Sequence, residues 1–195
     1  MSQAIRSALD RAQVQPKQVT VSVPSQEVLL RFFTMPLLPK AEWRSAIQFE
    51  VRKYIPFKIE ELVWVFHVSE QKPSRQMRVA FMGIRSERLS RIQRWLEGAG
   101  VRASRIEAHA VSLSRLAPKL PNATDNDFTV VVEVEPDAAH IVIVQPHVPY
   151  FARDINLTRG GEAASGAADP RPERLQSELW LSMDFFKREL PAAAI

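Results

Sequence analysis

Histidines are the first candidates for chemistry in this sequence, because an imidazole can bind a metal or transfer a proton near neutral pH. The four histidines, His67, His109, His140 and His147, show neither the HxxxH nor the HExxH spacing of a local metal site. The chain has no cysteine, which excludes thiolate ligands and disulfides and favours a reducing compartment. A metal site would need ligands that are distant in the sequence, and we expect none.

Motifs for nucleophilic catalysis and phosphate binding are missing from the sequence. No GxSxG, GxxxxGK[ST] or GxGxxG segment occurs, so no motif supports a hydrolase, a P-loop protein or a dinucleotide-binding protein. The double glycine Gly160-Gly161 follows a predicted strand, where its backbone amides could approach a phosphate. An isolated glycine pair is more often a plain turn. We therefore predict no catalytic residue.

Arginines recur along one predicted helix. Arg85, Arg88, Arg91 and Arg94 repeat every third residue, so on a helix of about 3.6 residues per turn they spread over roughly half of the circumference. We interpret them first as a solvated face and second as a contact for acidic protein or lipid headgroups. With 26 basic and 22 acidic residues, the charge excess does not identify a partner class. Nucleic-acid binding would require aromatic residues on an exposed sheet, and we expect no such partner.

The spacing of apolar residues predicts the elements that position these side chains. Period-two and branched segments favour strands, and spacings of three and four favour helices. Over residues 19–99 the order is strand, strand, helix, strand, strand, helix, which is typical of a small α+β module. The predicted helices are 2–13, 40–54, 84–99 and 107–117, and the predicted strands are 19–23, 27–33, 62–69 and 76–83, the last two forming a hairpin.

A polar break at residues 121–127 precedes a second pattern. Strands at 128–134, 140–144 and 150–155 predict a meander, followed by a loop of small residues at 160–172 and a helix at 172–190. No segment approaches the roughly 18 consecutive apolar residues of a membrane span, and the N-terminus lacks the apolar core of a signal peptide. We expect a soluble, uncleaved chain.

The end of the predicted helix 40–54 is unusually apolar. It reads Tyr54-Ile55-Pro56-Phe57, where a surface helix would normally close with glycine or a charged residue. Pro56 forces Ile55 out of helical geometry, so the chain turns while its apolar side chains persist. These side chains either plug the module's own core or form an exposed groove for a partner peptide. Composition leaves both interpretations open.

Several motifs, in a consistent order, resemble the PilM family, the actin-like cytoplasmic proteins of type IV pilus assembly. The resemblance begins with VTVSVPSQEVLLRFFTMPLLPKAEWRSAIQFEVRKYIPFKIEEL. It continues through VAFMGIRSERLSRIQRWLEGAGV, TVVVEVEPDAAHIVIVQPHVPYFARDINLTRGG and ELWLSMDFFKREL, and so covers nearly the whole chain. The residues that match the first motif are Pro24, Arg31, Pro36, Glu50, Tyr54, Ile55, Pro56 and Phe57.

The resemblance implies a mixed fold of class α+β or α/β. It would be a partial actin-like (RNase H-like) fold with a small inserted α+β module. The implied parts are residues 1–24, the end of the first actin-like subdomain; 25–103, the inserted module; 104–120, the return helix of the first subdomain; and 125–195, the start of the second subdomain.

The phosphate-binding segments of the family are incomplete in this sequence. A family member would carry an Asp-x-Gly loop in a strand pair before the helix of residues 2–13, and this sequence shows no such segment. In the second phosphate hairpin, Glu133-Val134-Glu135 corresponds to Asp-x-Gly and puts an anion where backbone amides should meet phosphate. We therefore expect no cofactor, with ATP and Mg²⁺ possible only in a longer parent protein. The residual phosphate-loop positions are Glu133, Glu135, Arg153, Gly160 and Gly161.

By this resemblance, the protein would be a non-catalytic platform of type IV pilus assembly. It would be cytoplasmic and peripheral to the inner membrane, would hold the cytoplasmic N-terminal peptide of a PilN-like membrane protein, and would contact the pilus assembly ATPase. We expect the peptide on the surface around Phe32, Phe33, Tyr54, Ile55 and Phe57.

Two alternatives remain open, and one further expectation follows from the strand order. The protein could be an ATPase that uses Arg153 with the amides of Gly160 and Gly161, or a platform of type II secretion, because the secretion protein GspL shares the general architecture. Without a preceding strand pair, strand 19–23 would expose a sheet edge. We therefore expect the chain to self-associate.

Overall fold

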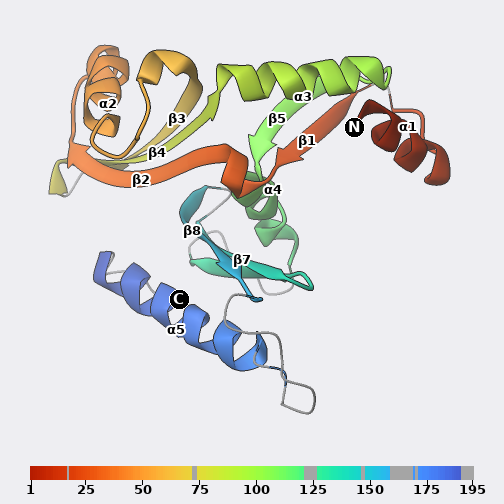
Figure 1. Cartoon of the computed structure of the whole chain (residues 1–195). Coiled ribbons are helices and arrows are strands. Elements are labelled where there is room, and N and C mark those ends of the chain that lie inside the picture. Colours follow the sequence, from red (N-terminus) through yellow and green to blue (C-terminus); the bar gives the residue numbers. More distant parts are fainter. Residues whose placement is uncertain are drawn as a thin grey trace. The chain divides into compact units, whose positions relative to one another are not determined.

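The computed structural model describes seven stretches of the chain and divides into two compact units, Met1–His109 and Ala110–Ile195 (Figure 1). The predicted turn at 146–147 and the glycines Gly160 and Gly161 lie outside the described residues. The described stretches are 1–16, 18–71, 74–120, 127–145, 148–158, 169 and 171–189.

The first unit contains an antiparallel sheet in the order β2-β4-β3. Its central strand β4 is more buried than β2, and Met77, Val79 and Phe81 are fully buried. The predicted hairpin is confirmed, but its second strand extends to Arg85, because Ile84 continues the ladder and pairs with both Val28 and Val63. The strands are β2 (Val28–Pro36), β3 (Leu62–Gln71) and β4 (Gln76–Arg85).

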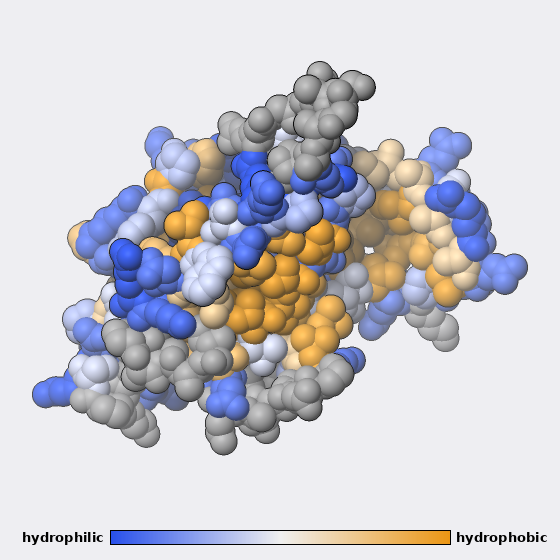
Figure 2. Space-filling model, turned by 90° about the horizontal axis from the view of Figure 1, so that it is seen from below, coloured by the Kyte–Doolittle hydropathy of each residue, from blue (hydrophilic) through white to orange (hydrophobic). Residues whose placement is uncertain are grey.

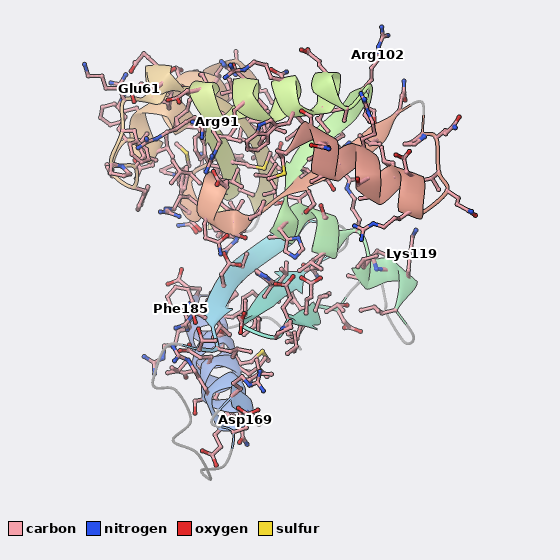
Figure 3. All side chains as sticks on the ribbon, turned by 45° about the vertical axis from the view of Figure 1, so that its right-hand side comes forward. Glu61, Arg91, Arg102, Lys119, Asp169 and Phe185 are labelled. Atoms are coloured by element: carbon pink, nitrogen blue, oxygen red, sulfur yellow. The ribbon has the colours of Figure 1, made fainter. Side chains whose placement is uncertain are left out.

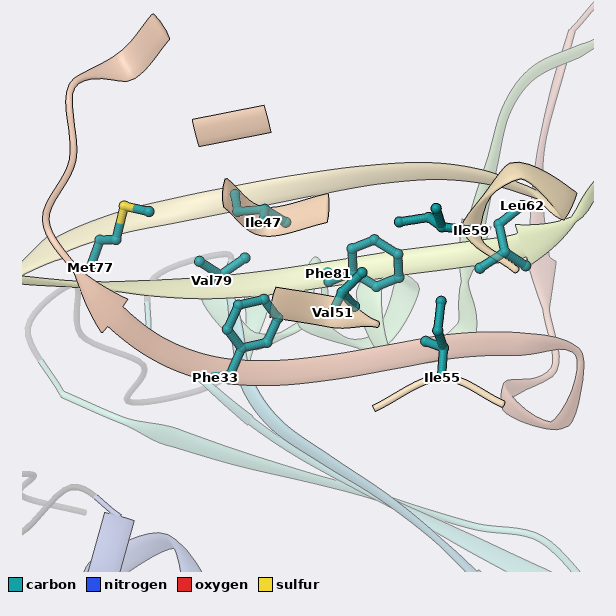
Figure 4. Close-up of a cluster of buried hydrophobic side chains, with 9 residues drawn as sticks. All are labelled: Phe33, Ile47, Val51, Ile55, Ile59, Leu62, Met77, Val79 and Phe81. Carbon is teal, nitrogen blue, oxygen red and sulfur yellow. The ribbon is translucent and has the colours of Figure 1, made fainter. Parts of the chain in front are cut away.

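Helix α2 (Trp43–Val51) covers one face of this sheet and follows a 3₁₀ turn, η2 (Lys40–Glu42). It ends three residues before the predicted Tyr54, and the chain then closes with a tight turn in which the Tyr54 amide donates to the Val51 carbonyl at 2.9 Å. Figure 4 shows the core between helix and strands. Its buried residues are Phe33, Ile47, Val51, Ile55, Ile59, Leu62, Met77, Val79 and Phe81.

A second, parallel sheet in the first unit pairs β1 (Val19–Val23) with β5 (Ala103–Ala108). Helix α3 (Ser86–Gly98) runs from the three-stranded sheet to α1 (Ser2–Arg11), where Arg6 donates a hydrogen bond to the Gly98 carbonyl at 2.9 Å (Figure 1). Gly100 has φ +76°, which permits the turn after α3. The apolar core here is Val23, Ile84, Ile92 and Leu96, joined by Ile5, Val21, Val28, Leu89, Trp95 and Ile106.

The predicted helix over 107–117 is wrong at its start, because residues 107 and 108 belong to strand β5. The structure has β5 to Ala108 and a shorter helix, α4 (His109–Ser114). The segment becomes a strand because it pairs with β1, with Val21 opposite Ile106. The β5 segment shows no alternation of apolar and polar residues, because it buries Glu107 and exposes its first three residues. Its strand structure depends instead on pairing with β1, which is distant along the chain.

The second unit contains the predicted meander, an antiparallel sheet in the order β6-β7-β8. The central strand β7 is buried from Ala139 to Val144. One face packs against helix α5 through Leu175 and Leu179, which contact the cluster around Ile141 and Ile155. The elements are η5 (Ala117–Lys119), β6 (Thr129–Val134), β7 (Ala138–Val144), β8 (Pro149–Asn156) and α5 (Arg171–Glu189). Within the described residues, no helix is long and apolar enough to cross a membrane.

Candidate functional site

The Tyr-Ile-Pro-Phe corner closes the core of the first unit. Phe33 and Ile55 are buried, with 8% and 9% of their surface exposed. The ring of Tyr54 stacks on the ring of Phe33, with centroids 5.5 Å apart and planes 20° apart, and leaves Tyr54 43% exposed. Ile55 therefore belongs to the core of the first unit, whereas Tyr54 lies at its surface and is partly exposed to solvent.

The other two predicted peptide contacts lie apart from this stack. Phe32 alternates with Phe33 along β2 and so points to the opposite face of the sheet. Phe57 is half-buried under the guanidinium of Arg85, which lies 3.7 Å from the ring centroid. The structure therefore brings Phe33, Tyr54 and Ile55 together and separates Phe32 and Phe57 from them. Peptide contact at these residues stays a prediction.

A groove of about 300 Å³ lies on the sheet face opposite α2. We call it the strand-edge groove. It is lined by Val63 and Val65 of β3, by Met82 and Ile84 of β4, by Leu89 and Gln93 of α3, and by residues 103–106 of β5. Val63 and Val65 are 47% and 54% exposed, so the apolar wall is accessible. Only Arg105 carries a charge among these lining residues.

Sequence reasoning missed this groove, although one signal was present. In LVWVFHVS the buried Leu62 and half-buried Trp64 alternate with Val63 and Val65, so both faces of the strand are apolar. A strand at a solvated surface would carry polar residues on its outer face. The apolar outer face therefore marked a second contact surface. Its position opposite β5 required the three-dimensional structure.

Two of the strands that line the strand-edge groove, β3 and β5, lie at the edges of their sheets within the described residues. Within the described part of the chain, β3 and β5 each pair with a strand on one side only. Val63 and Val65 of the edge strand β3 and residues 103–106 of the edge strand β5 line the groove. Such an edge presents unpaired N–H and C=O groups that can accept another strand.

Apolar side chains are exposed elsewhere too, and Figure 2 shows hydrophobic residues gathered in one area of the face that it displays. The two most exposed large ones among the described residues are Trp180 of α5 at 71% and Phe49 of α2 at 69%. Neither lines the strand-edge groove. Phe185, labelled in Figure 3, is 52% exposed on α5 and lies near Phe151, with ring centroids 5.7 Å apart.

The residual phosphate-loop positions lie in the second unit. The Glu135 amide donates to the Ala138 carbonyl at 2.8 Å within the β6-β7 turn, so that N–H already has a partner. The guanidinium of Arg153 lies 2.7 Å from a carboxylate oxygen of Glu178 on α5. Glu133 lies opposite His140 in the ladder of β6 and β7. Gly160 and Gly161 lie outside the described residues.

Polar side chains also cross the meander in one row. His140 lies between Glu133 on β6 and Asp154 on β8, and its Nδ1 is 2.7 Å from an Asp154 carboxylate oxygen. His140 is 8% exposed, so this contact holds a polar side chain within an apolar strand. The contact between His140 and Asp154 joins β7 to β8.

The mixed sheets and helices define a class: the chain has a partial actin-like fold of α+β type with a small α+β module. More particularly, this chain belongs to the family described as type IV pilus assembly protein PilM, whose model matches residues 1–166.

Solved structures agree with this fold. A chain of the PilM-PilN type IV pilus biogenesis complex matches with a TM-score of 0.75 and 22% identity, covering 97% of this chain and 64% of that chain. The cytoplasmic domain of EpsL, an inner membrane component of the type II secretion system of Vibrio cholerae, matches with a TM-score of 0.58 and 11% identity, covering 80% of this chain and 57% of that domain's chain.

This chain spans 64% of the length of the matched chain of the PilM-PilN complex. No curated protein matches the sequence. The subdomain boundaries predicted at residues 24, 103, 120 and 125 stay predictions.

Proposed function

We propose that this protein is a non-catalytic platform of type IV pilus assembly that holds the N-terminal peptide of a PilN-like inner-membrane protein. Membership of the PilM family and the likeness to a PilM-PilN complex support this role. In this proposal the protein works at the inner membrane through its partner and contacts the pilus assembly ATPase.

The observation that carries the proposal is the strand-edge groove. A peptide site of this kind needs apolar pockets for alternate side chains and main-chain groups for register. Val63 and Val65 form an exposed apolar wall, and the edge strand β5 lines the groove with residues 103–106. Both requirements are met within one groove of the first unit.

The peptide would bind as an extended segment along β5. Alternate side chains would enter the space between Val65 and Leu89, and the main chain would pair with the β5 edge. The groove volume of about 300 Å³ is at the lower end of the range for ligand sites, about 300–1,000 Å³, and suits one or two anchoring side chains.

The contacts in the second unit support a non-catalytic role. The Arg153 guanidinium pairs with Glu178, and the Glu135 amide is engaged in the β6-β7 turn. A phosphate at this hairpin would also face the carboxylate of Glu135. Each contact opposes an ATPase that would use these groups on a nucleotide.

Val65→Glu tests the groove directly. A buried carboxylate in an apolar groove is costly, so the affinity for a synthetic N-terminal peptide of the PilN-like protein from the same organism should fall at least about tenfold. Isothermal titration calorimetry measures this affinity, and circular dichroism checks the fold. Phe49→Glu is the matched control, because Phe49 is exposed on α2 and lies outside the groove.

An unchanged affinity in folded Val65→Glu overturns the strand-edge groove as the peptide site. If Tyr54→Ala lowers the affinity and Val65→Glu does not, the peptide instead binds at the Tyr-Ile-Pro-Phe corner. Tight, magnesium-dependent ATP binding to the unmodified chain would favour the ATPase alternative.

A further inference from the structure

A second cavity, of about 430 Å³, lies in the first unit between β2, β3, β4 and the first turns of α3. We call it the arginine pocket. Its apolar side is formed by Val28, Leu29, Phe57 and Leu62, and its charged side by three arginines and two glutamates. The charged residues are Glu27, Arg85, Glu87, Arg88 and Arg91, of which Arg91 is labelled on α3 in Figure 3.

Two of the three arginines already have carboxylate partners. Arg88 forms a bidentate ion pair with Glu27, and Arg91 pairs with Glu87 at 2.9 Å, one helical turn away. Arg85 differs from both. Its guanidinium lies against the ring of Phe57, 3.7 Å from the ring centroid, and it makes no ion pair with a described carboxylate. Within the described part of the chain, the pocket wall therefore keeps one positive charge without a carboxylate partner.

The position of Arg85 favours a planar anion as its partner. The aromatic ring lies against the guanidinium and supports its orientation, while the N–H donors lie in the guanidinium plane and remain available at its rim. A carboxylate accepts two parallel N–H bonds from such a group, which is stronger and more directional than a contact with a lysine.

The apolar side of the pocket favours a ligand that has an apolar group next to its carboxylate. Leu29, Phe57 and Leu62 offer hydrophobic surface beside the charged wall, so a ligand that is wholly charged would leave half of the pocket unused. A peptide with an acidic residue next to an apolar one matches both sides. The volume of about 430 Å³ lies within the range of small ligand sites and accommodates such a pair.

Charge distinguishes an acidic peptide from a nucleotide. Three arginines and two glutamates leave a formal charge of +1 in the wall, which balances one carboxylate. A polyphosphate would bring several negative charges close to Glu27, whose side chain is 29% exposed, and like charges repel there.

We propose that the arginine pocket is a docking site for an acidic segment of a protein partner, in which a carboxylate pairs with Arg85 and a neighbouring apolar side chain packs on Leu29 and Phe57. This site differs from the strand-edge groove. Leu62 and Arg85 of the pocket point to one face of the β3-β4 hairpin, whereas Val63 and Ile84 of the groove point to the other.

Nuclear magnetic resonance titration of the full chain tests the docking site. The probe is the peptide acetyl-Leu-Asp-Leu-Glu-Leu-amide, and its neutral match carries Asn and Gln in place of the two acids. The acidic peptide should shift the Arg85 Nε–H signal and the backbone signals of Leu29 and Leu62. The neutral peptide should shift them at least about fivefold less at equal concentration, because the charge-assisted bond is lost.

Two variants locate the contact. Arg85→Gln should weaken binding of the acidic peptide about tenfold, and Arg85→Lys should weaken it less, because lysine keeps the charge but loses the bidentate geometry. Arg52→Gln is the control, since Arg52 is an exposed arginine paired with Glu60 outside the pocket. Arg85→Gln should leave binding of the PilN-like peptide unchanged, which separates this site from the proposed function.

Three results would overturn the docking site. The first is equal shifts from the acidic and neutral peptides. The second is an affinity of folded Arg85→Gln for the acidic peptide that equals that of the unmodified chain. The third is a titration in which inorganic phosphate or ATP shifts the Arg85 signal while the acidic peptide does not.

Discussion

The ring of Tyr54 stacks on the ring of Phe33 at a centroid distance of 5.5 Å, and this contact joins the turn after α2 to the middle of β2. Phe33 is buried and Tyr54 is 43% exposed, so the pair forms the boundary between core and solvent. The apolar corner is therefore explained in large part by packing, and each residue of the pair has a different expected role in stability.

Truncation of Tyr54 measures this packing. Tyr54→Ala should lower the stability of the first unit by about 1–2 kcal/mol, since it removes the aromatic stack and part of the apolar contact, whereas Tyr54→Phe should cost little. Hydrogen exchange of the β4 amides reports the stability of this unit. A loss of PilN-peptide affinity in Tyr54→Ala without loss of stability would contradict the packing role.

Two residues on α2 provide a matched comparison of core and surface. Ile47 is fully buried in the cluster of Figure 4, and Phe49 is 69% exposed two residues later. Ile47→Ala should destabilise the first unit by about 2–5 kcal/mol, because it leaves a cavity, and Phe49→Ala by less than about 0.5 kcal/mol. Urea unfolding followed by tryptophan fluorescence compares the two. Equal effects would show that α2 packs on a different face.

The start of α5 should be sensitive to acid. Asp169 accepts hydrogen bonds from the side chain and backbone of Arg171, and these bonds, helped by the positive charge of Arg171, lower the pKa of the Asp169 carboxyl. Because the folded-state pKa lies below the unfolded one, the contribution is present above the unfolded pKa and is lost as pH falls through the folded pKa.

Proton titration by nuclear magnetic resonance checks this expectation for Asp169. The carboxyl should titrate below the ordinary range of an aspartate, and the first turn of α5 should lose order over the same acidic interval. Asp169→Asn keeps a side-chain acceptor for the Arg171 amide but has no carboxyl to titrate, so its α5 signals should not change there. An ordinary pKa for Asp169 would contradict the bond to Arg171.

The edge of β1 leads to a prediction about assembly. Within the described residues β1 pairs with β5 alone, which leaves its other edge without a neighbouring strand. We expect self-association at tens of micromolar, measured by light scattering, and a lower average mass for Thr20→Lys, because an added charge opposes edge pairing. Strictly monomeric behaviour of the unmodified chain at that concentration would exclude this mode of association.

Much of the local structure followed from the sequence. The period-two segment at β1, the branched and aromatic segment at β2 and the three-and-four spacing in α2 and α3 predicted elements that the structure contains. Their ends were less exact: α2 closes at Val51 because the next residues form a tight turn, and β4 continues to Arg85 because two neighbouring strands hold it. Strand ends depend on partners that a local pattern does not contain.

For the candidate sites, too, some features follow from the sequence and others only from the tertiary structure. The sequence by itself determined that both faces of the β3 segment carry apolar residues, that an apolar corner follows the α2 segment, and that Glu133 and Glu135 stand in the β6-β7 segment. Only the tertiary structure decided that β5 pairs with β1, that Val65 and β5 line one groove, and that Arg85 lies over Phe57. The reason is physical. Periodicity reports the burial of a residue's own face, whereas a site is made by contacts between segments far apart in the chain, whose pairing is chosen by packing of the whole core.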